Sequence, residues 1–407
     1  MTGSRGWVVS TCSAVLLMAA CTLMPRTIGA LGPFIVRDLG LSPSQFGSLV
    51  SAIFFVSAAC AIGSARIVDR LPATRLMRAL LLLVIVDVVL VAGASSYQLL
   101  IVVVGLAGVS QGLANPVANR IVRTAVPPSR QALAIGLKQS AVQLGTAFAA
   151  FVLPSLALVF GWQQGVLALL LLPLVALAVS LSVGQSTGRG ASSTGSAVGH
   201  ASRPTWRGAD DGTWRLAVYS FFIAAGVSGV ATYVTLYAHE RLGFSESTAG
   251  LVLGFVGLAA VLGRIGWAQA AGRRPESNRI AAVVAAAGAA STCLLAMAPL
   301  LGGWLVWVGA IGVGATAMGA NAVSNLSVVR RSESSSTGQS SAIVAFGFFC
   351  GFIPGPVVFG LVVETTAGYY GAWAVVVLEL AFAAWVVARR DAPKRAQVAI
   401  PDDLQQA

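Results

Sequence analysis

Long apolar segments alternate with short polar loops along nearly the whole chain. A helix of about 20 apolar residues crosses the hydrocarbon core of a bilayer, which is roughly 30 Å thick. Each segment is therefore predicted to be a membrane-spanning helix, because a helix satisfies its own backbone hydrogen bonds in lipid. The twelve predicted spans cover residues 8–34, 44–65, 76–95, 98–118, 131–157, 162–183, 214–237, 246–268, 279–298, 303–325, 338–363 and 371–388.

A short sequence recurs about half a chain length further on. LGLS at 39–42 is followed 203 residues later by LGFS at 242–245, and at the same offset Gly47 corresponds to Gly250. In a very apolar chain, a repeat at this spacing indicates two copies of one helical bundle. Internal duplication is a recurring design of membrane transporters, in which a pathway runs between the two halves.

The spans and the repeat together predict an all-α integral membrane protein made of two pseudo-symmetric six-helix bundles. The first bundle is predicted at 1–183 and the second at 214–390. A Gly- and Ser-rich linker at 184–213 joins them, and a polar tail follows at 391–407. Segments of this composition behave as flexible linkers.

Composition excludes an ordinary soluble domain. Hydrophobic residues make up 57% of the chain and charged residues 10%, whereas globular chains have about 25% charged residues. With the N-terminus placed in the cytoplasm, 22 of the 26 Lys and Arg residues, Arg264 among them, fall on the cytoplasmic side. Only Arg37 and Arg241 fall outside, so the positive-inside rule predicts that both termini are cytoplasmic. The net charge of +12 then needs no nucleic acid to explain it.

The sequence predicts neither a cofactor nor a metal site. The five cysteines lie in predicted spans without metal-ligand spacing, and no phosphate-binding G-x-x-x-x-G-K-[ST] motif occurs. His200 and His239 are far apart and on opposite sides of the predicted membrane, so clustered catalytic groups for an enzyme are absent from the sequence pattern.

The loop after the second predicted span has the most specific motif. Residues 65–75 read ARIVDRLPATR, with Asp69, Arg70 and Arg75 at characteristic positions. This loop resembles the signature loop of the major facilitator superfamily, although Ala and Pro replace its two glycines. The resemblance covers almost the whole chain and implies that superfamily's fold. The segment from Pro25 to Ser42 also looks like the cyanate/nitroimidazole-type branch, which supports an anionic solute.

Charges at the cytoplasmic ends of the second and third spans are candidates for a gate. Asp69, Arg70 and Arg75 can form pairs in one conformation and be solvated in the other, which would bias a two-state equilibrium. The alternative is that the arginines anchor the loop in the anionic headgroup layer.

Two pairs of asparagines repeat between the halves. ANPVAN at 114–119 corresponds, 206 residues later, to ANAVSN at 320–325. The members of each pair are four residues apart and share one helix face. We assign Asn119 and Asn325 to the gate, and the deeper residues Asn115 and Asn321 to solute binding. The alternative is hydrogen bonding between helices without a solute.

Four ionisable residues lie inside predicted spans: Arg26, Asp87, Lys138 and Glu379. An isolated charge at mid-membrane costs roughly 2.5–3.5 kcal/mol on insertion scales, so each needs a partner, a watery cavity or a neutral form. In the resembled fold, helices one and five line the pathway, whereas three and twelve support it from outside. By that resemblance Arg26 and Lys138 face the pathway, and Asp87 and Glu379 are the candidates for proton coupling.

Lys138 begins a polar patch that includes Gln139 and Gln143. Two cations facing one cavity predict an anionic or carboxylate-bearing solute, and the prolines around Arg26 predict a bend in the first span. In the alternative interpretation, Asp87 holds Lys138 and the lysine never contacts the solute.

We therefore predict a multi-pass secondary transporter of the bacterial cytoplasmic membrane that acts as a monomer on a small organic anion by alternating access. Its partners are the solute and the lipid bilayer, with no nucleic acid. Proton coupling stays open. A drug or metabolite efflux antiporter of the same fold is the alternative, and a membrane enzyme or a transporter-like sensor is the remote one.

Overall fold

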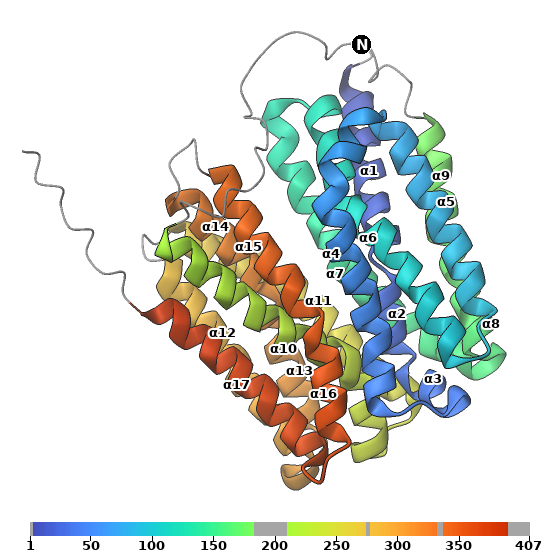
Figure 1. The fold of residues 1–407 in the computed structure, drawn as a ribbon, viewed down its shortest axis with the longest axis vertical. Helices are drawn as coiled ribbons and strands as arrows, with labels where there is room; N and C mark the ends of the chain where they lie inside the picture. Colours follow the sequence, from blue (N-terminus) through green and yellow to red (C-terminus); the bar gives the residue numbers. More distant parts are fainter. Residues whose placement is uncertain (1–2, 183–209, 274–276, 332–336, 390–407) are drawn as a thin grey trace, which may run out of the picture.

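The structure, a computed structural model, describes residues 3–182, 210–273, 277–331 and 337–389. Every regular element in these ranges is a helix, as Figure 1 shows, which confirms the predicted all-helical class for this part of the chain. The predicted linker at 184–213 lies almost entirely outside the described residues, and the tail at 391–407 lies wholly outside them.

The helices of the first half are α1 (Gly3–Cys21), α2 (Met24–Ala30), α3 (Gly32–Leu39), α4 (Pro43–Arg70), α5 (Ala73–Ala92), α6 (Tyr97–Ala125), α7 (Pro128–Phe160), α8 (Trp162–Leu167), η1 (Ala168–Leu170) and α9 (Leu171–Ser182). Those of the second half are α10 (Asp211–Leu242), α11 (Glu246–Arg273), α12 (Ser277–Leu301), α13 (Leu305–Ala315), η3 (Ala317–Gly319), α14 (Ala320–Arg331), α15 (Thr337–Phe352), α16 (Pro354–Val363) and α17 (Gly368–Ala388).

Each predicted span coincides with one helix or with a series of short ones. Ten helices among the described residues are long and apolar enough to cross a membrane, or eleven if the bent pair Gly6–Cys21 and Met24–Ala30 is one span. The helix missing from this set is α5, which has 20 residues. It contains Arg75, Arg78 and Asp87 within that length, so charge rather than length sets it apart.

The helices pack as two groups, α1–α9 and α10–α17. The groups meet where α4 packs against α16, α7 against α11, and α2 and α3 against α10. In Figure 1 their ribbons lie close together at the end that holds α3 and α16, which we name the joined end. They diverge toward the end that holds the N-terminus, which we name the spread end.

The LGLS and LGFS segments have the same local role in both groups. Gly40 ends α3 with φ 58° and Gly243 ends α10 with φ 66°, a left-handed conformation that glycine adopts without steric cost. Ser42 and Ser245 then start the next helix, because each hydroxyl accepts the backbone N–H three residues further on. The repeat is thus a helix-end signal followed by a helix-start signal.

The corresponding glycines Gly47 and Gly250 lie where a helix of one group crosses a helix of the other. A Cβ atom on Gly47 would overlap the backbone carbonyl of Pro356 in α16. A Cβ atom on Gly250 would come within 2.6 Å of the Pro154 ring in α7. The absence of a side chain therefore lets α4 and α11 approach the opposite group closely at the joined end.

The predicted bend in the first span is confirmed. Helix α1 ends at Cys21 and α2 begins at Met24, with a bend of 47° between them. Pro25 has no backbone N–H to donate and stands in the first turn of α2, where this deficit does not matter.

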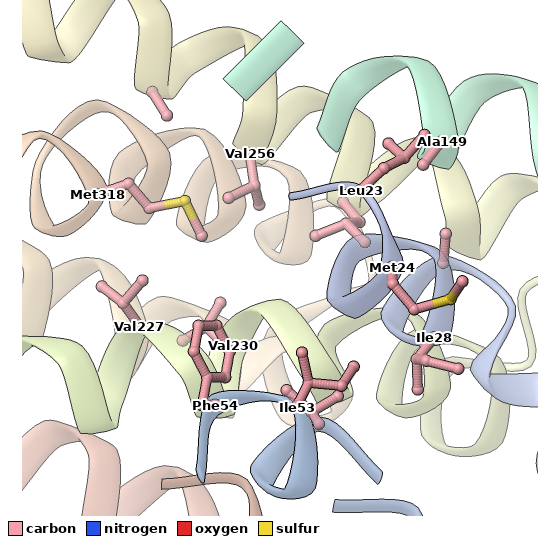
Figure 2. Packing of buried hydrophobic residues seen from close by; sticks show 14 of the residues in the cluster. Leu23, Met24, Ile28, Ile53, Phe54, Ala149, Val227, Val230, Val256 and Met318 are labelled. Atoms are coloured by element: carbon pink, nitrogen blue, oxygen red, sulfur yellow. The ribbon is translucent and has the colours of Figure 1, made fainter. Parts of the chain in front are cut away.

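Apolar side chains of both groups surround a central region between them. Figure 2 shows Leu23, Met24, Ile28, Ile53, Phe54 and Ala149 of the first group around the same region as Val227, Val230, Val256 and Met318 of the second. All of them are buried. A charged group beside such side chains needs a partner, because burying an unpaired charge is costly.

Candidate functional site

Arg26 lies in the first turn of α2, just after the bend. Its Nη1 atom donates a hydrogen bond of 2.6 Å to the carbonyl oxygen of Thr22. In an unbroken helix that carbonyl would accept the backbone N–H of Arg26, which instead donates to Leu23. The bend thus frees a carbonyl, and the half-buried guanidinium satisfies it.

Lys138 and Asn115 come together inside the first group. The side chain of Lys138 in α7 is only 1% exposed, and its Nζ atom donates to Oδ1 of Asn115 in α6 at 2.5 Å. The described residues include no ion pair between Lys138 and Asp87. The amide oxygen satisfies one ammonium proton without neutralising the charge.

Asp87 lies in a separate place, in a cavity of about 10 Å³ between α1, α5, α6 and α9. Cys21, Met24 and Ser110 also line this cavity. The Oδ1 atom of Asp87 is buried and has no hydrogen-bond partner among the described residues. A cavity of this size has room for about one water molecule.

Arg264 is a cation that the sequence interpretation did not include among the candidate site residues. It was counted with the cytoplasmic-side charges, but it lies within the candidate span formed by α11. Its Nε atom is buried, and no described residue accepts a hydrogen bond from its guanidinium group. Its position inside the predicted span 246–268 was the signal that could have identified it.

Arg26 and Arg264 belong to opposite groups of helices, and both lie within candidate membrane spans. The backbone of Arg264 packs on Gly319 of η3, where a Cβ atom would come within 3.2 Å of the Arg264 nitrogen. Each group therefore holds an arginine within a span.

The other predicted site residues are not brought into one cluster. Gln143 is buried where α7 meets Gly257 of α11, whereas Gln139 and Asn321 are half-buried without a described hydrogen bond. Glu379 is half-buried in α17. Of the gate residues, Arg70, Arg75 and Asn119 are exposed, and the side chains of Asp69 and Asn325 lie outside the description.

The joined end has polar contacts between the groups that sequence reasoning missed. Arg37 and Glu246 form an ion pair of 2.6 Å between α3 and α11. Tyr233 of α10 donates its hydroxyl to the carbonyl of Pro43 at 2.6 Å. These pairs join residues about 200 positions apart, and no local pattern predicts such partners.

Glu364, directly after α16, also contacts the first group at the joined end. Its Oε1 atom accepts the backbone N–H of Ser44 at 2.9 Å. This hydrogen bond, together with the hydroxyls of Ser44 and Ser42, holds the pKa of the Glu364 carboxyl below its ordinary value.

Two groups of long apolar helices, joined at one end and each with cations inside its spans, define a membrane protein of the transporter type. A model of the Major Facilitator Superfamily matches residues 11–341, so the chain belongs to this superfamily. The predicted family is confirmed, whereas its cyanate/nitroimidazole-type branch stays a prediction.

Curated relatives match part of the chain. Two uncharacterized MFS-type transporters, from two strains of Mycobacterium tuberculosis, are 30% identical over 213 residues, which are 50% of this chain and 46% of theirs. A probable sulfoacetate transporter of Cupriavidus necator is 28% identical over 142 residues, which are 35% of this chain and 33% of that protein. The chain thus spans less than half the length of the curated relatives it matches.

Solved structures resemble nearly the whole chain. A bacterial homolog of the human lysosomal transporter Spinster, inward-facing and unoccupied, has a TM-score of 0.73 at 16% identity, covering 94% of this chain and 96% of that one. A mutant of the nucleoside transporter NupG has a TM-score of 0.75 at 13% identity, covering 94% and 100%. Identities this low show the fold alone. The relatives and the fold are those of transporters and not of enzymes.

Proposed function

We propose that this protein is a secondary transporter that moves a small organic anion across the cell membrane by alternating access. Membership of the superfamily supports the transport mechanism. The observation that supports an anion is that Arg26 and Arg264, one in each group, lie within candidate spans and have no acidic partner among the described residues. An anion entering there would offset the cost of two charges held away from water.

Lys138 is a third cation inside the spans. Its partner is the neutral amide of Asn115, so its charge persists and raises the positive potential near the pathway. We assign Gln139, Gln143 and Asn321 to the polar lining around the solute.

The proposed topology has twelve spans, and α5, with three charged residues in its 20, is one of them. The two groups correspond to the predicted bundles 1–183 and 214–390. Arg264 no longer counts as a loop charge, which leaves 21 Lys and Arg residues that the sequence assigns to the cytoplasmic side against two that it assigns outside. The spread end is therefore assigned to the cytoplasm, and the described conformation is closed on the outer side.

Gating at the spread end is assigned to Asp69, Arg70, Arg75, Asn119 and Asn325. In the described conformation Arg70, Arg75 and Asn119 are exposed, as expected for gate residues whose partners lie across an open end. Their pairing belongs to the conformation in which that end is closed.

Proton coupling is assigned to Asp87 first and Glu379 second. The partnerless Oδ1 atom of Asp87, in a cavity of about one water molecule, supports a carboxyl group that binds and releases a proton. Glu379 has no comparable cavity among the described pockets.

The test is uptake of radiolabelled carboxylates and sulfonates into proteoliposomes containing the full chain, with and without a pH gradient. We expect accumulation or exchange of an organic anion, a marked loss in Arg26→Gln, and no loss in the matched variant Arg241→Gln on the exposed end of α10. If a pure, folded protein moves no anion from the panel, the proposal is wrong. Transport of cationic drugs instead would favour the efflux alternative.

The relative named for sulfoacetate transport guides the choice of solutes in this panel. Sulfoacetate is an organic anion, so it and simple carboxylates of the same size are the first compounds to compare.

A further inference from the structure

The three tyrosines of α10 each donate a hydroxyl to a backbone carbonyl, and one of them reaches the opposite group. Tyr219 and Tyr237 donate to carbonyls of α12, in their own group, at 3.1 and 2.8 Å. Tyr233 donates to the carbonyl of Pro43, in α4 of the first group, at 2.6 Å. All three side chains are buried. Tyr233 therefore differs from the other two in that its hydrogen bond joins the two groups.

The hydroxyl of Tyr233 also has a second acceptor. The carbonyl oxygen of Pro356, in α16 of its own group, lies 3.1 Å away. A tyrosine hydroxyl has one proton, so the two carbonyls compete for it. The distance of 2.6 Å to Pro43 is within the usual range for a hydroxyl donor, whereas 3.1 Å lies just beyond it. In the described conformation the proton therefore belongs to the bond across the groups.

The sequence around the two acceptors follows one pattern. Residues 43–47 of α4 read PSQFG and residues 356–360 of α16 read PVVFG, so both are P-x-x-F-G. In each helix the glycine stands one turn after the acceptor carbonyl. A Cβ atom on either Gly47 or Gly360 would overlap the Tyr233 hydroxyl. The two glycines therefore leave the proline carbonyls open to this one hydroxyl.

The phenylalanines of the two P-x-x-F-G segments contact the tyrosine ring. Phe359 of α16 stacks on the ring of Tyr233, with centroids 4.4 Å apart and planes at 22°. Phe46 of α4 meets the ring edge-on, with centroids 5.5 Å apart and planes at 86°. Both arrangements are favourable for aromatic pairs. The stacked partner belongs to the same group as Tyr233, so the ring is attached to its own group and the hydroxyl reaches across.

We infer that Tyr233 is a latch between the two groups, whose hydroxyl donates to Pro43 while the joined end is closed and changes to Pro356 when that end opens. Leaving a buried hydroxyl without an acceptor is costly, and a second carbonyl in the same group avoids this cost as the groups part. The inference rests on the alternating access of the proposed function, but not on the charge or identity of the solute.

The experiment measures how often the joined end opens. Spin labels on the exposed residues Ser95 and Thr366, in the full chain without native cysteines, give the ratio of long to short distances at that end. Tyr233→Phe removes only the hydroxyl. Water can replace the lost bond at an open end but not at a closed one, so we expect the ratio of open to joined molecules to rise by about threefold to tenfold.

Tyr219→Phe and Tyr237→Phe are the matched controls. Each removes the same atom from the same helix and breaks the same kind of bond, but to an acceptor within the second group. Thermal melting temperatures should fall in all three variants, because each loses a buried hydrogen bond. The ratio of open to joined molecules should rise in Tyr233→Phe alone, which separates a latch from a general contribution to stability.

Gly360→Ala tests the same contact without a change at the tyrosine. Its Cβ atom would lie 2.5 Å from the Pro43 oxygen and would also overlap the Tyr233 hydroxyl. The joined conformation should therefore become rarer. In a chain that already carries Gly360→Ala, adding Tyr233→Phe should raise the ratio by less than about twofold, because the bond across the groups is already broken.

The outcomes separate this inference from the proposed function. If folded Tyr233→Phe keeps the wild-type ratio, or if Tyr237→Phe raises it as much, the latch is overturned while alternating access stands. If the short distance persists in every variant, Gly360→Ala included, the latch fails together with opening of the joined end. Anion uptake, measured separately, tests the solute of the proposed function.

Discussion

Lys138 and Asn115 form a hydrogen bond of 2.5 Å between α7 and α6, with the buried ammonium as donor. The asparagine belongs to the first copy of the duplicated ANPVAN sequence, and the lysine has no equivalent in the second copy, where Val344 stands 206 residues later. The bond is therefore a feature of the first group that the second does not repeat.

Removing the acceptor of this bond should destabilise the protein more than removing both partners. Asn115→Leu leaves a buried ammonium without its acceptor, which costs about 1–3 kcal/mol in the free energy of unfolding. The double variant Asn115→Leu with Lys138→Met replaces both partners by apolar groups and should recover most of that loss. Thermal unfolding in detergent measures this, and a double variant as unstable as Asn115→Leu would contradict it.

A methyl group at the crossing of α4 and α16 should hold the joined end apart. Overpacking a tight contact costs about 1–3 kcal/mol, so Gly47→Ala is expected to lower the population of the joined conformation by about tenfold or more. Spin labels on the exposed residues Ser95 and Thr366, in a variant without native cysteines, would report a longer distance.

Gly266→Ala is the matched control for this prediction. A Cβ atom on Gly266 in α11 has nothing within 4 Å, so the substitution should leave the label distance unchanged. Equal effects of Gly47→Ala and Gly266→Ala would mean that close approach is not the reason for the glycine.

The joined end should depend on pH through Glu364. Its pKa is lowered in the described conformation, so the ionised carboxyl stabilises the contact with Ser44 above the ordinary glutamate pKa of about 4.3. The contribution is lost as the pH falls through the lowered pKa. The distance between the labels on Ser95 and Thr366 should lengthen in the native chain as the pH falls from neutral to acid. In Glu364→Gln, the part of this lengthening that is due to the carboxyl should be absent.

The ion pair between Arg37 and Glu246 should influence conformation more than stability. Arg37 is 62% exposed, and exposed pairs contribute only about 0–1 kcal/mol to folding. Arg37→Glu or Glu246→Arg alone places like charges together and should widen the joined end, whereas the two changes combined should restore it. If the combined variant stays as wide as the single ones, the pair has no part in closure.

The sequence predicted the elements well because their signals are local. Gly40 and Ser42, repeated as Gly243 and Ser245, mark helix ends through backbone conformation and capping, and apolar length marks the spans. The bend beside Arg26 followed from proline chemistry in the same way.

The site could be predicted only in part because it depends on how helices rotate and cross. That Lys138 meets Asn115 is decided by the packing of α7 on α6, which no spacing along the chain reveals. Arg264 was missed because a charge near the end of a span was assigned to the loop without regard to which way its helix face turns. Gly47 and Gly250 were recognised as a repeat, but only the crossing helices show why they are glycines.

Arg26 and Arg264, which have no acidic partner among the residues that the structure describes, also bear on the empty protein. Closing the spread end narrows the space between the groups and brings two like charges nearer to each other. We therefore expect an empty protein to resist that movement and a bound anion to ease it. Under the proposed function the protein would return across the membrane when loaded, which favours exchange of solutes over cycling of the empty protein.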